Sequence, residues 1–201
     1  MARLVALLLC LILANAHAGA ALPDATPYTL LARSTPPTVQ PPLSEQQREW
    51  LAGRNLLRLG TSAPDYPPFD ITSGGTDYQG LTAEYASLVG KALKLPIRVQ
   101  RYPDRNAAVP ALKRGEIDLL GSANGFEAAT DGLALSQPYA VDQPVLVTRE
   151  NETRNLNSGL EGMRLGMLYH YLPRTEVHGI DPKAELLVFG SATQALNAVA
   201  F

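Results

Sequence analysis

The stretch that decides the predicted fold is Leu56-Leu57-Arg58-Leu59-Gly60-Thr61-Ser62-Ala63-Pro64-Asp65-Tyr66-Pro67-Pro68-Phe69-Asp70. Its apolar first part has the length of a strand and stops at Gly60, and a proline-stiffened loop with two aromatic side chains follows. Open α/β sheets bind ligands at the carboxyl ends of their strands. Because proline fixes φ, Tyr66 and Phe69 would be presented at a small entropic cost. The stretch therefore predicts the lip of a small-molecule pocket, with a plug at the edge of the core as an equal alternative for Phe69.

Composition and the first residues indicate an exported globular protein. The chain has 201 residues and a formal net charge of −2 at pH 7, which favours one or two soluble domains and gives no sign of a nucleic acid partner. Arg3 precedes an apolar run that ends in small residues, so residues 1–18 are predicted to be a secretory signal peptide. Cys10, the single cysteine, lies within that run. The mature chain would therefore form no disulfide.

Two segments precede the first strand. Residues 19–42 contain six prolines and almost no apolar periodicity, so we expect an extended tether. Ser44 and Gln47 then have the spacing of a capping box. This predicts a short helix with Trp50 and Leu51 on its buried side.

The first lobe is predicted over residues 43–148. Apolar residues at helical spacing, beginning at Leu81 and Tyr85, predict a helix that ends near Lys94. Alternation predicts a strand over 96–102, Asp104 is a candidate cap for the next helix, and residues 117–120 are a candidate short strand. Strand, helix, strand, helix and strand with short connections predict a parallel α/β sheet.

The second lobe is predicted over residues 149–201. We expect strands over 163–168 and 185–189, a weak helix over 170–177, and a final helix that opens with a capping box at Ser191 and Gln194. The last helical pattern has no closing signal before Phe201. The sequence therefore predicts a second lobe that is cut short, in a fragment of a longer protein.

Motifs of enzymes and metal sites are missing from the sequence. It contains no glycine-rich phosphate loop, no Cys/His metal spacing and no Gly-x-Ser-x-Gly elbow. His170 and His178 are interpreted as surface or interface histidines, and Glu116 and Asp118 as solvated charges beside a strand. We expect no catalytic residue, no cofactor and no metal in this chain.

What remains is a binding crevice formed by the loops that follow the strands. Free N–H groups in these loops suit an anionic solute, Ser122 and Asn124 would add hydrogen bonds, and the aromatic rings would cover an apolar part. For Asn124 the alternative is a turn residue that tolerates positive φ. The candidate ligand-binding residues are Ser62, Asp65, Tyr66, Phe69, Ser122, Asn124 and Tyr169.

Several motifs together resemble family 3 extracellular solute-binding proteins, which are periplasmic Venus-flytrap modules. In chain order they are Leu57-Arg58-Leu59-Gly60-Thr61 with Tyr66-Pro67-Pro68-Phe69, Gly80-Leu81-Thr82-Ala83-Glu84, the run from Pro110 to Leu119, and Leu135-Ser136-Gln137-Pro138-Tyr139. The helix preceding the first strand and the run from Asp142 to Arg149 resemble the sensor region of BvgS-type hybrid histidine kinases. The resemblance covers about residues 43–201.

The resemblance implies a two-lobe flytrap that closes on a small solute, or one that signals with no tightly held solute. It also implies a full-length protein that spans the membrane, forms a homodimer and signals through a cytoplasmic kinase. One alternative is a free solute-binding protein of an ABC importer, and another is a periplasmic enzyme on the same fold. Relatives that bind amino acids carry an Arg that pairs with the ligand carboxylate, whereas the run from Asn124 to Gly132 contains none.

Overall fold

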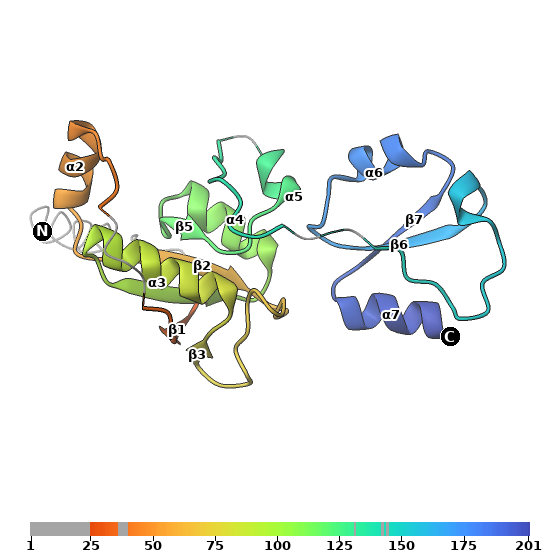
Figure 1. Ribbon diagram of the computed structural model, residues 1–201, viewed down its shortest axis with the longest axis horizontal. Coiled ribbons are helices and arrows are strands. Elements are labelled where there is room, and N and C mark those ends of the chain that lie inside the picture. Colours follow the sequence, from red (N-terminus) through yellow and green to blue (C-terminus); the bar gives the residue numbers. More distant parts are fainter. Residues whose placement is uncertain (1–24, 36–39, 131, 142, 144) are drawn as a thin grey trace, which may run out of the picture.

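The computed structural model describes residues 25–35, 40–130, 132–141, 143 and 145–201. The predicted signal peptide and Cys10 lie outside these residues. Two lobes follow one another along the long axis (Figure 1). Within the described residues, no helix has the length and apolar character needed to cross a membrane.

The sheet of the first lobe has the strand order β3-β1-β4-β2-β5. Strand β2 (Leu57–Ser62) lies between β4 (Ile97–Tyr102) and β5 (Leu119–Leu120) and pairs in parallel with both. The strands β1 (Thr26–Leu30) and β3 (Asp77–Tyr78) extend the sheet on the other side of β4, and β1 runs antiparallel to it. The sheet is therefore mixed, not purely parallel as the sequence predicted.

Strand β1 corrects the prediction of a tether over 19–42, because part of that segment belongs to the sheet. Beyond β1, the backbone N–H groups of Arg33 and Ser34 donate to the carboxylate of Glu84, at 2.8 to 3.1 Å. These bonds hold the pKa of Glu84 below its ordinary value. The high proline content concealed the strand, since proline is uncommon inside strands. Pro27 is nevertheless part of β1, because proline is tolerated at strand positions that need no N–H donor.

Helix α3 (Leu81–Leu93) has the predicted bounds but buries the opposite face. Its buried residues are Thr82, Ala83, Ala86, Ser87 and Gly90, whereas the larger Leu81, Tyr85 and Val89 are exposed. A Cβ at Gly90 would lie 2.8 Å from the oxygen of Leu95 and 2.9 Å from Cγ1 of Ile97. The helix packs so closely on the sheet that small residues are required there.

Helix α2 (Glu45–Ala52) begins with the predicted capping box between Ser44 and Gln47. The expectation that Trp50 and Leu51 are buried is wrong, because the helix buries none of its residues and Trp50 is 48% exposed. The guanidinium of Arg54 lies over the indole ring, 4.3 Å from its centroid. This contact covers one face of the indole.

Helix α4 (Arg105–Lys113) is capped by Asp104 as predicted. The carboxylate of Asp118, expected to be solvated, has a side chain that is only 6% exposed and accepts from both Arg58 and Arg54. The bond from Arg58 is the main reason that the pKa of Asp118 is lowered. Asp118 thus ties the start of β5 to β2.

The second lobe contains a two-stranded parallel sheet of β6 (Arg164–Leu168) and β7 (Glu185–Phe189). The short 3-10 helix η1 (Leu156–Ser158) precedes it, and α6 (Arg174–Ile180) and α7 (Ala192–Ala200) flank it. Its buried cluster consists of Met167, Val177 and Leu186. At α7 the predicted capping box is half formed, because Gln194 Oε1 accepts from the N–H of Gly190.

Candidate functional site

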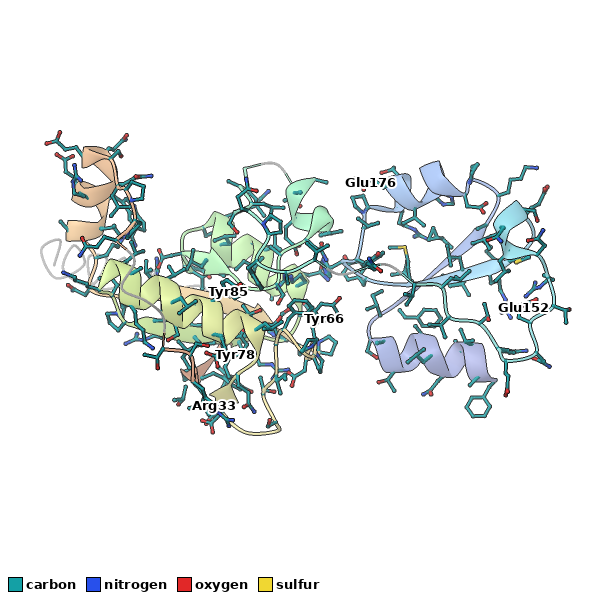
Figure 2. All side chains as sticks on the ribbon, in the orientation of Figure 1. Arg33, Tyr66, Tyr78, Tyr85, Glu152 and Glu176 are labelled. Carbon is teal, nitrogen blue, oxygen red and sulfur yellow. The ribbon has the colours of Figure 1, made fainter. Side chains whose placement is uncertain are left out.

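The carboxyl ends of β2 and β6 point toward each other, so the loops that follow them lie between the lobes (Figure 1). Figure 2 shows Tyr66 at the side of the first lobe that is nearer the second. The rings of Tyr66 and Phe69 are stacked, with centroids 5.3 Å apart and planes 15° apart. Tyr66 is 41% exposed. A partly exposed aromatic pair thus lies beside the end of β2, where Ser62 is the last residue of the strand.

Asp65, predicted to bind ligand, bonds instead within its own lobe. Its Oδ1 lies 2.8 Å from Nη2 of Arg101, and its Oδ2 accepts from the N–H of Thr72 at 2.8 Å. The hydroxyl of Thr72 also donates to this carboxylate at 3.0 Å. The carboxylate of Asp65 therefore already has protein partners, and these bonds hold the loop that carries Tyr66 and Phe69 against β4.

A buried acid and phenol pair lies at the end of the same loop. The hydroxyl of Tyr78, which is fully buried, donates to Oδ1 of Asp70, which is 5% exposed. Burial, and then the negative charge of Asp70, raise the pKa of Tyr78 far above its ordinary value. The phenol therefore stays protonated and can satisfy the carboxylate. The sequence analysis missed this pair, since its members are eight positions apart and form no recognisable motif.

Ser122 belongs to a cluster of hydroxyl groups. Thr82 Oγ1 lies 2.9 Å from both Ser122 Oγ and Tyr139 Oη, and the ring of Tyr139 packs on Tyr85 with centroids 4.7 Å apart. Ser122 has a φ of +51°, and a Cβ at the preceding Gly121 would lie 2.8 Å from Cγ2 of Thr82. The loop after β5 thus depends on Gly121 and on the left-handed backbone conformation of Ser122.

An ion pair inside the first lobe supports this loop. Nε of Arg105 donates to Oε1 of Glu127 at 2.8 Å, and its Nη2 donates to the carbonyls of Gly121 and Ser122, both at 2.8 Å. The side chains of Arg105 and Glu127 are 11% and 1% exposed. The sequence analysis missed both residues, although Asn124 and Glu127 have the spacing of a capping box that could have revealed the glutamate.

Asn124 is the N-cap of α5 (Gly125–Ala128) and has a φ of −137°, so its interpretation as a positive-φ turn residue is wrong. Its side chain accepts from the N–H of Phe126, and its Nδ2 donates to the carbonyl of His170 in the second lobe at 2.8 Å. Tyr169 Oη donates to Oδ1 of Asn106, in the first turn of α4, at 2.9 Å. The structure thus brings the predicted residues Asn124 and Tyr169 together at a direct contact between the lobes.

Among the described residues there is no group of three or more His, Cys, Asp or Glu side chains that could hold a metal ion. Apart from Asp65, whose carboxylate is paired with Arg101, the candidate side chains at the facing ends of the two lobes carry aromatic rings, hydroxyls and an amide. Such groups bind a small solute by hydrogen bonds and ring contacts.

Comparison with known proteins gives the family. Residues 57–196 match the family of bacterial extracellular solute-binding proteins, family 3. The virulence sensor protein BvgS of Bordetella bronchiseptica is 43% identical over 173 residues, which are 86% of this chain and 14% of that protein. The chain therefore spans a small part of the length of the sensor proteins that it matches.

Two solved structures share the fold. The B. pertussis BvgS periplasmic domain superposes with a TM-score of 0.70 at 40% identity, over 87% of this chain and 34% of that one. The Bordetella pertussis BvgS periplasmic VFT2 domain superposes with a TM-score of 0.69 at 19% identity, over 80% of this chain and 68% of that one. At this identity the match supports the fold alone. From the family match over most of the chain, together with two sheets whose strand ends face each other, we conclude that this protein belongs to the bacterial extracellular solute-binding proteins, family 3.

Proposed function

We propose that this chain is the periplasmic input module of a membrane-anchored sensor histidine kinase, and that a small solute changes how its two lobes meet. The observation that carries the proposal is the 43% identity to a sensor protein over 173 residues, in a fold that matches a periplasmic sensor domain at a TM-score of 0.70. In this proposal residues 1–18 direct export, and homodimerisation, membrane anchoring and kinase activity belong to the full-length protein.

The proposed solute site lies between the loops at the facing strand ends. Its residues are Ser62, Tyr66, Phe69, Ser122, Asn124 and Tyr169, and Asp65 is left out because its carboxylate bonds to Arg101 and Thr72. Arg105 is likewise paired with Glu127. Since these two arginines have carboxylate partners of their own, the first lobe would hold its solute by hydroxyl, amide and aromatic contacts instead of by a carboxylate clamp.

Thermal-shift screening of the chain against pools of small polar solutes tests the proposal. We expect at least one solute to raise the melting temperature of the wild type but not of Ser122→Gly, which removes the hydroxyl and tolerates the left-handed backbone. Ser73→Gly is the matched control, because Ser73 is an exposed serine with a φ of +46°. A solute that stabilises Ser122→Gly as strongly as the wild type would contradict this site.

The complete gene tests the sensor role separately. We expect it to encode a membrane-spanning segment and a histidine kinase region after Phe201. A gene without either, beside genes for a transporter, would favour a free solute-binding protein of an importer instead.

A further inference from the structure

The contact between the lobes contains a partly buried histidine, His170, that the proposed solute site does not use. It lies in the loop after β6, next to Tyr169, and its carbonyl accepts the hydrogen bond from Asn124. Its φ is +65°, in the left-handed region that histidine enters more often than most residues do. The backbone bend at His170 therefore sets the part of the second lobe that contacts the first.

The imidazole of His170 packs against two aromatic rings. Its ring meets Phe126 of α5 edge-on at a centroid distance of 4.4 Å, and Tyr169 at 4.0 Å. Both ring nitrogens are shielded from solvent, and neither finds a hydrogen-bond partner among the described residues. A neutral imidazole leaves one N–H unsatisfied there, whereas an imidazolium would leave two N–H groups and a charge.

The charged groups that face His170 do little to stabilise an imidazolium. Glu127 of α5 would favour it, but its carboxylate is bonded to Arg105 of α4 and to the N–H of Asn124. Arg105 is itself a positive charge that opposes protonation, and Asp104, the N-cap of α4, favours it. Burial outweighs these charges and lowers the pKa of His170 below its ordinary value of 6.5.

We propose that the loop after β6 is a proton-sensitive latch, in which neutral His170 allows the two lobes to meet through Asn124 and Tyr169 and a proton on His170 releases them. The latch rests on the proposed sensor role only for its biological consequence. The latch needs no solute, so its failure would not affect the test of solute binding. Failure of the solute-binding test would likewise leave the latch unaffected.

The direction of the pH effect follows from linkage. We call the loop after β6 docked when it contacts the first lobe and free when it does not. The docked loop binds fewer protons than the free loop, because the pKa of His170 is lowered only in the docked state. Docking is therefore at full strength above pH 6.5 and weakens as the pH falls toward the lowered pKa. One proton changes the docking equilibrium by at most about tenfold per pH unit. Between pH 6.5 and 5.5 we therefore expect the ratio of docked to free chains to fall by up to about fivefold, because half of the free histidines are already protonated at pH 6.5.

Spin labels at Lys113→Cys in the first lobe and Thr193→Cys in the second, both at exposed positions, measure the separation of the lobes in a chain that also carries Cys10→Ser. We expect the distribution of distances to broaden on acidification in this background. His170→Asn, which tolerates the left-handed backbone and does not titrate, should abolish the change. His178→Asn, on the exposed side of α6, should leave it intact. An unchanged distribution between pH 7.5 and 5.5, or an equal change in His170→Asn, would overturn the latch.

A second measurement needs no substitution. The chain has three histidines, so the imidazole of His170 can be followed by NMR through a pH titration. We expect its pKa to lie below the ordinary histidine value of 6.5. A midpoint for His170 at or above 6.5 would overturn the proposal.

Discussion

At the scale of single residues, the loop after β5 depends on Arg105 and Glu127. Replacing Arg105 by alanine leaves the carboxylate of Glu127, which is 1% exposed, without its cation and frees the carbonyls of Gly121 and Ser122. Breaking a buried ion pair from one side typically costs about 3 to 5 kcal/mol. We therefore expect urea denaturation to show a loss of this size in the free energy of unfolding for Arg105→Ala.

The control for this prediction is Arg114→Ala. Arg114 pairs with Glu116 at the surface, where solvent screens the pair, so its loss should matter much less. Equal losses for the two variants would mean that the buried pair has no special role in the loop.

Tyr78 gives a prediction on pH. Its pKa in the folded chain lies above the ordinary value near 10, so the folded chain retains a proton that the unfolded chain loses in alkali. Stability should therefore be fully present below about pH 10 and fall above it by up to about 1.4 kcal/mol per pH unit. Tyr78→Phe removes this contribution, so denaturation of both proteins at pH 9 and pH 11 measures it. The prediction fails if the wild type and the variant lose stability equally.

At the scale of elements, α3 depends on Gly90. Alanine is favoured over glycine within helices by about 1 kcal/mol, but a Cβ at this position would meet the backbone of Leu95 at 2.8 Å. Overpacking of this kind typically costs about 1 to 3 kcal/mol. We expect Gly90→Ala to lower the melting temperature. Gly179→Ala in α6, where a Cβ meets nothing within 4 Å, should maintain or raise it.

The exposed side of α3 illustrates what periodicity cannot decide. The pattern of Leu81, Tyr85 and Val89 correctly predicted a helix, but it did not predict which side would be buried. That side is chosen by the distance between helix and sheet, which Gly90 and the small residues around it allow to be short. Large apolar residues were therefore left on the surface.

At the scale of the whole molecule, the sequence predicted the order of the longer strands and helices from β2 to α7, but it missed the short elements β3, α5 and η1. Local signals such as the caps at Ser44, Asp104 and Ser191 mark the elements directly. Strand β1 was missed because its pairing with β4 joins residues about 70 positions apart, and no local pattern encodes that pairing.

The candidate site was predicted only in part, for the same reason. The sequence singled out the loops at strand ends, and the structure brings Tyr66 together with Phe69, and Asn124 into contact with the second lobe. It could not foresee that Asp65 would bond to Arg101, or that Thr82 would join Ser122. Those contacts depend on packing between segments that are distant in the sequence.

The central claim is that a small solute changes how the two lobes meet. The most direct measurement compares the distribution of distances between spin labels at Lys113→Cys and Thr193→Cys, in the Cys10→Ser background, before and after adding a solute that stabilises the chain. The account predicts that the solute shifts the distribution of distances in the chain with Ser122 and leaves it unchanged in the chain with Ser122→Gly. A solute that raises the melting temperature while the distribution between the lobes stays the same would contradict it.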